Sequence, residues 1–194
     1  VRSLIGAGRK NLIINGDMQV SQRGDFTTAG VMGNNVYYLD RFASLISVVS
    51  ATIQDTTNSI KIVATTAATG YIGTTQKFED KVYNKLKGKT VTFSAKVTSN
   101  NSNTKLRVFT GAAWVESPVS HSGNGTEETL TFTYTIAATM SSLSVQIITY
   151  NGGNVALAVG DYIEVSEVQL ELGSVATDFE HRSYGEELAL CQRY

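Results

Sequence analysis

Cysteine, histidine, proline and charged residues are all scarce in this 194-residue chain. The one cysteine, Cys191, provides no disulfide framework and no paired-cysteine metal motif, and it leaves the redox compartment open. The two histidines, His121 and His181, lie far apart and without a paired acidic motif, which argues against a zinc site. Charged residues make up 17% of the chain and the net charge is -1, so we expect no electrostatic capture of nucleic acid.

Long apolar runs are missing as well. No stretch of about 18 apolar residues occurs, so we expect no membrane insertion, and the first residues do not have the pattern of a signal peptide. The chain begins with Val1 rather than methionine, which fits a piece of a longer protein. Its length suits one domain with a substantial core.

Threonine, serine and valine are abundant instead, with 23, 18 and 19 residues against a single proline. Threonine and valine are stiff at the first side-chain torsion and fit a pleated surface. Apolar residues alternate with polar ones in "TVTFSAKV" (90–97) and in "TLTFTYTI" (129–136). Turn residues separate about eight to ten such segments, which predicts an all-β, antiparallel two-sheet sandwich of the jelly-roll type.

One segment changes its inward face part-way. In "GDYIEVSEVQLELG", Ile163 and Val165 are apolar at odd positions, whereas Val168 and Leu170 are apolar at even positions. One extra residue in a strand makes this switch, so we predict a β-bulge near 166–167; two short strands joined by a kink would give the same pattern.

The segment "NLIINGDMQVSQRG" (11–24) opens the domain with an apolar run and a polar turn. We expect this run to lie beside the late strand and to close the sandwich through Leu12 and Ile14. Residues 15–17 then form a turn, and Arg23 is expected to bind a carboxylate.

The two ends of the chain differ from the middle. Residues 1–10 carry glycines and basic residues without alternation, which predicts a connector. Residues 181–194 contain helix formers, with Glu186 and Glu187 in a first helical turn that suits carboxylates. A short C-terminal helix is therefore expected after a sandwich that spans 11–180.

No catalytic motif is visible. The sequence has no nucleophile elbow and no recognisable Ser–His–Asp grouping, and adjacent carboxylates on a strand point to opposite faces. Cys191 on an apolar helix stripe is typical of a packed thiol. Loop and strand carboxylates at Asp17, Asp161 and Glu164 are candidate oxygen ligands for a structural calcium ion.

A binding surface is the better candidate. Sugars are bound by aromatic rings that stack on their C–H faces and by planar amide or guanidinium groups that reach their hydroxyls. The residues with this chemistry are Trp114, Tyr71, Gln76, Arg107, Phe109 and Gln146. A lone tryptophan in a sandwich is commonly a packing residue, and the others are also compatible with an ordinary solvated sheet.

Two motifs carry a resemblance. "GRKNLIINGDMQVSQRG", followed by "YYLDRF", resembles the opening of the C-terminal domain of bacteriophage tail-fibre and other virion structural proteins. "VSEVQLELGSVATDFEHRSYGEELALCQRY" resembles its closing segment, and both ends are similar to the first and last strands of jelly-roll carbohydrate-binding modules.

The resemblance implies a non-enzymatic virion-surface protein, a tail fibre or spike, which binds host-surface glycans, assembles as a homotrimer and contacts other virion proteins. A capsid decoration protein of the same fold, or a fragment of a glycan hydrolase, would be the alternatives. Related modules carry an acidic residue near calcium just after the opening motif. Met18 and Gln19 stand there in this chain, which puts that metal in doubt.

Overall fold

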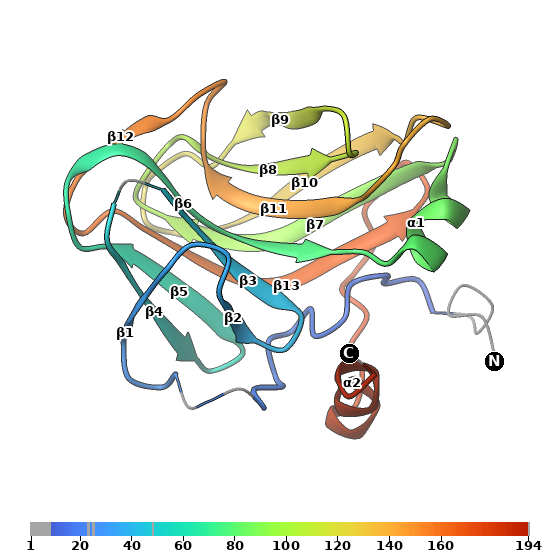
Figure 1. Cartoon of the computed structure of the whole chain (residues 1–194), viewed down its shortest axis with the longest axis horizontal. Helices are drawn as coiled ribbons and strands as arrows, with labels where there is room; N and C mark the ends of the chain where they lie inside the picture. The colour runs from blue at the N-terminus through green and yellow to red at the C-terminus, as the bar shows by residue number, and fades with distance from the viewer. Residues whose placement is uncertain (1–8, 23, 25, 48, 194) are drawn as a thin grey trace.

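The computed structural model describes residues 9–22, 24, 26–47 and 49–193. They form thirteen strands and two helices, and every strand pair is antiparallel (Figure 1). The predicted two-sheet sandwich with a short C-terminal helix is confirmed. No helix in this described part is long and apolar enough to cross a membrane.

The strands divide into two sheets, which we name sheet I and sheet II. Sheet I has the spatial order β1 (Gly30–Met32), β4 (Ala51–Thr56), β5 (Ser59–Ala64), β13 (Tyr162–Leu172), β7 (Thr90–Ser99) and β10 (Glu127–Thr135). Sheet II has the order β2 (Tyr37–Leu39), β3 (Phe42–Ser47), β6 (Ala68–Lys77), β11 (Ser144–Thr149), β8 (Thr104–Phe109) and β9 (Trp114–Ser120), with β12 (Val155–Leu157) paired to β6. The helices are α1 (Asp80–Leu86) and α2 (Tyr184–Cys191).

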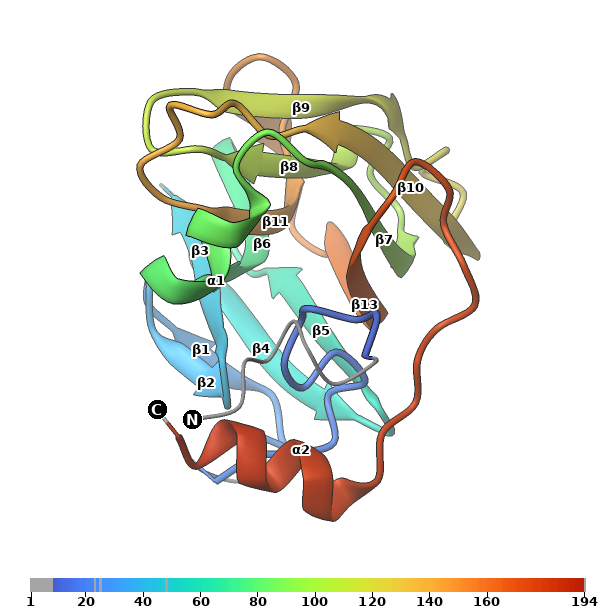
Figure 2. The ribbon, with the colours of Figure 1, turned by 90° about the vertical axis from the view of Figure 1, so that its right-hand side faces the viewer.

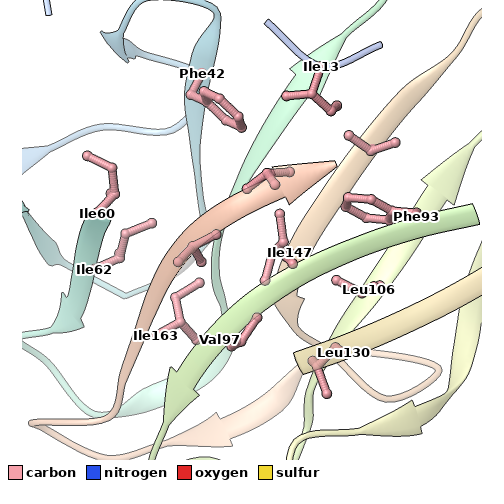
Figure 3. Close-up of a cluster of buried hydrophobic side chains, with 14 of the residues drawn as sticks. Ile13, Phe42, Ile60, Ile62, Phe93, Val97, Leu106, Leu130, Ile147 and Ile163 are labelled. Carbon is pink, nitrogen blue, oxygen red and sulfur yellow. The ribbon is translucent and has the colours of Figure 1, made fainter. Parts of the chain in front are cut away.

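The core lies between the two sheets (Figure 3). Phe93 and Val97 of β7 and Leu130 of β10 come from sheet I, and Leu106 and Ile147 come from sheet II. These are the alternating positions that the sequence predicts to point inward. Their burial removes apolar surface from water, which is the main favourable contribution to folding.

The predicted bulge is present in β13. Ser166 pairs with Lys96, the next paired residue is Gln169, and Glu167 has a positive φ of 47°. Val165 and Val168 are therefore both fully buried in the core. Because of the extra residue, both halves of β13 pair with β7 and both turn their apolar side chains toward the core.

The opening segment lies beside β13, as predicted, but it is not a regular strand. The Leu12 N–H donates to the Leu170 carbonyl at 2.8 Å, and the Asn11 side chain accepts from the N–H groups of Ile13 and Leu170. The bond from the Ile13 N–H to the Asn11 side chain turns the backbone, and Ile13 lies in the main core. The prediction for Ile14 is thereby corrected: it packs instead in a small cluster with Val20 and Cys191.

Buried polar contacts fasten the closing segment to the opening one. The Arg182 guanidinium donates to the carbonyl oxygens of Ile13 and Asn11 and to Glu187 Oε1, the last at 2.9 Å. Glu187 Oε2 accepts from the Asn15 N–H at 2.9 Å. Both charged side chains are almost fully buried, and we call this group of contacts the terminal clasp.

Three other parts of the chain differ from the sequence expectations or lie outside the described residues. The segment 41–55 alternates less regularly than the other strand candidates of the sequence, and it is divided between β3 in sheet II and β4 in sheet I. Helix α1 was not expected, because its seven residues are too few to show a helical period. Residues 1–8 of the expected connector and Arg23 lie outside the described residues.

The C-terminal helix begins where a capping box forms. The Ser183 side chain accepts from the Glu186 N–H, and the Glu186 carboxylate accepts from the Ser183 N–H. Glu186 and Glu187 occupy the first turn as expected. Figure 2 shows the chain after β13 running along the outside of sheet I before it reaches α2.

Candidate functional site

Five of the six predicted binding residues lie on the outer face of sheet II. Arg107 pairs with Gln146 across β8 and β11, and Phe109 pairs with Trp114 across β8 and β9. Tyr71 lies on β6 with the parity of Thr75, the partner of Gln146. Because residues paired in register share a face, the outward positions of four neighbouring strands meet here.

Arg107 is the centre of this face. Its guanidinium carbon lies 4.2 Å from the ring centroid of Trp114 and 4.2 Å from that of Tyr150. Its Nε donates to Gln146 Oε1 at 2.9 Å. The side chain is buried, and burial lowers the pKa of Arg107, against the opposing effects of Tyr150 and Glu116. A planar guanidinium between two rings is a stacked arrangement that lysine cannot reproduce.

The aromatic rings extend the stack along the face. The centroids of Phe109 and Trp114 lie 4.3 Å apart, and those of Tyr71 and Tyr150 lie 6.4 Å apart. Trp114 is 46% exposed, although its other side rests on Phe109 and Arg107. Trp114 lies on the edge strand β9. We name these four rings with Arg107 the aromatic–arginine row.

Polar groups border the row. Lys105 Nζ lies 3.4 Å from Glu116 Oε2 and 3.3 Å from Asn151 Oδ1. Glu116 Oε2 also accepts from the Gly152 N–H at 3.1 Å. An aromatic platform beside fixed donors and acceptors can stack on an apolar surface and hydrogen-bond hydroxyl groups at the same time.

Gln76 is the exception among the predicted binding residues. It lies on the inner side of β6, where its Oε1 accepts from the Ile14 N–H at 3.0 Å and its Nε2 donates to the Ile14 carbonyl at 2.8 Å. The side chain is 1% exposed. This geometry corrects the placement of Gln76, because the residue holds the opening segment and does not reach the outer surface.

The candidate calcium ligands do not gather into one group. Asp161 accepts from the Asn101 amide at 2.8 Å and from the Ala158 N–H, whereas Glu164 accepts from the Ser59 hydroxyl at 2.6 Å. Asp17 lies with Glu164 along a hollow on sheet I. No cluster of three or more His, Cys, Asp or Glu side chains suited to a metal occurs among the described residues. The three side chains do not converge on one point among the described residues, and calcium binding stays a prediction.

No protein-family model matches the sequence, and no curated protein sequence matches it. Among solved structures, the CBM22-1–CBM22-2 tandem domain from Paenibacillus barcinonensis Xyn10C aligns with a TM-score of 0.50 and 13% identity, covering 84% of this chain and 50% of that one. The fold is the jelly roll of carbohydrate-binding modules. At this identity the likeness concerns the fold alone.

Two further solved structures align with lower scores. The CBM22-1 xylan-binding domain of the same Xyn10C has a TM-score of 0.49 and 13% identity, covering 79% of this chain and 99% of that one. The enzymatically active domain of bacteriophage CBA120 tailspike protein 4 has a TM-score of 0.43 and 15% identity, covering 84% of this chain and 21% of that one.

Tyr150 and Lys105 lie at this site but were not among its predicted binding residues. Tyr150 comes directly after the end of β11, at the next outward position after Gln146 and Ile148. The even-numbered parity of that strand would have identified it. Lys105 has the same parity as Arg107, is buried, and contacts Glu116 of the neighbouring strand.

Proposed function

We propose that this jelly-roll domain is a non-catalytic glycan-binding module of a bacteriophage virion-surface protein, a tail fibre or spike, and that it binds host-surface glycans on the outer face of sheet II. The aromatic–arginine row is the observation that carries this proposal. Nearly half of the Trp114 surface is exposed to solvent, and the Arg107 guanidinium packs against its ring. A ring held in this way can stack on a sugar at little cost in side-chain entropy.

The polar border supplies the second part of recognition. Lys105 and Asn151 already contact each other, so a hydroxyl that arrives here meets groups that are held in place. Direct hydrogen bonds from amide, ammonium and carboxylate groups give orientation, while the ring gives contact area. This combination favours a saccharide over a purely apolar ligand.

The virion role in this proposal rests on the opening and closing motifs, which resemble phage tail-fibre domains. In that setting the domain sits at the virion surface as part of a homotrimer and contacts other virion proteins. Light scattering on the isolated chain tests the trimer, because a monomer and a trimer differ threefold in mass. A monomer would assign trimerisation to another part of the virion protein.

A glycan array followed by titration of the best hit tests the binding face. Trp114→Ala is expected to weaken binding roughly tenfold or more, because it removes the exposed platform. Tyr184→Ala is the matched control, since Tyr184 is also an exposed aromatic residue (54%) but lies on α2. Arg107→Lys is expected to weaken binding as well, because lysine keeps the charge and loses the stack.

The proposal fails if no glycan binds at millimolar concentration, or if Trp114→Ala and Tyr184→Ala bind equally well. Failure of glycan binding together with co-purification on capsids would instead favour the decoration protein. Release of reducing ends from a host polysaccharide would contradict the non-catalytic assignment.

A further inference from the structure

Sheet I carries a hollow of about 320 Å³ on its outer face, far from the aromatic–arginine row on sheet II. A second hollow of about 450 Å³ adjoins it and shares Lys96, Glu167 and His181 with it. The first hollow is lined by Asp17, Gln19, Thr57, Asn58, Ser59, Lys96, Thr98, Glu127, Glu164, Ser166, Glu167 and His181. Volumes of this order are typical of small-molecule sites, roughly 300–1,000 Å³.

Three features of the chain build this hollow. The bulge in β13 brings two consecutive residues, Ser166 and Glu167, to its wall. The opening turn brings Asp17, because the Val168 N–H donates to the Gly16 carbonyl at 2.8 Å and seats the turn on the bulge. The segment that follows β13 brings His181. The hollow thus forms where the two ends of the domain meet.

The hollow has an excess of negative charge. Four carboxylates line it, whereas Lys96 is its one lysine or arginine among the described residues. Lys96 lies 2.8 Å from Glu167 and 3.7 Å from Glu127, so it offsets part of this charge. Glu167, through a hydrogen bond, raises the pKa of Lys96, which keeps the ammonium group charged.

Asp17 is the least compensated of these carboxylates. The side chain is only 4% exposed. Its Oδ2 accepts from the Gln19 amide, but its Oδ1 is buried and has no hydrogen-bond partner. Burial of a carboxylate oxygen without a hydrogen-bond donor costs free energy. In native proteins such an oxygen commonly binds a water, an ion or a ligand.

The lining indicates which kind of cation would fit. A compact metal ion needs several oxygens converging at about 2.3–2.6 Å, and the described residues provide no cluster of three metal-binding side chains. The carboxylates are instead spread around the hollow among hydroxyl and amide groups such as Ser59, Thr98 and Asn58. An organic cation that also carries hydroxyl groups matches this distribution.

We propose that this hollow is a second ligand site, which binds a saccharide bearing a free ammonium group. The ammonium group pairs with the carboxylate of Asp17, and the sugar hydroxyls reach the hydroxyl and amide groups of the wall. The site lies on the opposite sheet from the aromatic–arginine row and shares no residue with it, so the two proposals stand or fall separately.

Titration of the ¹⁵N-labelled chain with fully deacetylated chitotetraose, followed by NMR, tests the site. We expect saturable shifts of the Gly16, Ser166 and Glu167 amides, and about tenfold weaker binding of the N-acetylated tetramer, because acetylation removes the charge. Asp17→Asn is expected to weaken binding of the deacetylated tetramer about tenfold, and Tyr184→Ala on α2 is expected to leave it unchanged. Affinity should also fall as salt concentration rises.

Glu127→Gln provides a second variant, since Glu127 is exposed and its replacement should not impair folding if Asp17→Asn does. We expect it to weaken binding two- to fivefold. Equal binding of the two tetramers, or unchanged binding in both variants, would overturn the proposal. Stronger binding of a lysine oligopeptide would assign the hollow to a protein partner instead, and displacement of the sugar by calcium would assign it to a metal.

Discussion

Gly16 lies directly against the bulge of the last strand, where its carbonyl oxygen accepts a hydrogen bond of 2.8 Å from the Val168 N–H. A Cβ atom at position 16 would overlap the Val168 carbonyl oxygen and approach the Phe179 ring. The glycine is therefore required for close approach of two backbones that are separated by about 150 residues of sequence.

We expect Gly16→Ala to lower the free energy of unfolding by about 1–3 kcal/mol, because the bulge or the turn must shift. Urea denaturation measures this change. Gly30→Ala is the control, since nothing lies within 4 Å of a Cβ there, and its stability should stay within about 0.5 kcal/mol. Equal stability of both variants would mean that the turn can move off the bulge freely.

Removal of Arg182 is expected to be much more costly than removal of Arg9. Arg182→Ala leaves the buried Glu187 carboxylate without its guanidinium partner and should cost about 3–5 kcal/mol. Arg9→Ala removes a solvent-exposed pair with Glu186 and should lower the free energy of unfolding far less. Denaturation of the two variants under the same conditions gives the comparison, and a similar loss in both would contradict the burial of the terminal clasp.

The stability of the domain should depend on pH through Glu187. Burial raises the pKa of Glu187, against the hydrogen bond from the Asn15 N–H and the charge of Arg182. In the unfolded chain a glutamate has a pKa of about 4.3. As pH rises from that value through the raised native pKa, the unfolded state loses its proton first, so the free energy of unfolding decreases.

Comparison with Glu187→Gln isolates this contribution, because the remaining carboxylates titrate alike in both proteins. The difference in unfolding free energy, native protein minus variant, should decline as pH rises through this window. Urea denaturation at a series of pH values measures it. A difference that grows with pH would show that Arg182 outweighs the burial of the carboxylate.

Cys191 should be protected from thiol reagents while α2 is docked. The side chain is 1% exposed, and burial raises the pKa of its thiol to about 12. Because the thiolate is the reactive form, we expect modification by Ellman's reagent at pH 8 to be at least about 100-fold slower than in urea-unfolded protein. Equally fast modification would show that α2 leaves the domain readily.

The sequence predicts the core and the bulge well, because both follow from period-two burial. Phe93 and Leu130 alternate with threonines that face outward, and only one side of each strand can enter the interior. The parity change between Val165 and Val168 likewise has one simple structural cause. These features depend on local pattern alone, so no knowledge of the neighbouring strands is needed.

The candidate sites were only partly predictable, since they depend on which strands become neighbours. Alternation places Arg107 and Gln146 on outward faces, but only the pairing of β8 with β11 brings their side chains together. Gln76 has an amide group suited to sugar binding, but its position on β6 faces inward. Asp17 could not be recognised as a buried carboxylate, because the segments that cover it come more than 140 residues later.

The position of β13 also has a consequence for the order in which the domain is made. This strand lies between β5 and β7 and receives the opening segment, so all three remain without their neighbour until the ribosome has reached residue 172. At typical synthesis rates the residues near Asn11 wait for roughly 8 to 30 seconds. During that time two strand edges are open to other nascent chains, so the yield of this domain should depend on how quickly its last fifth is translated.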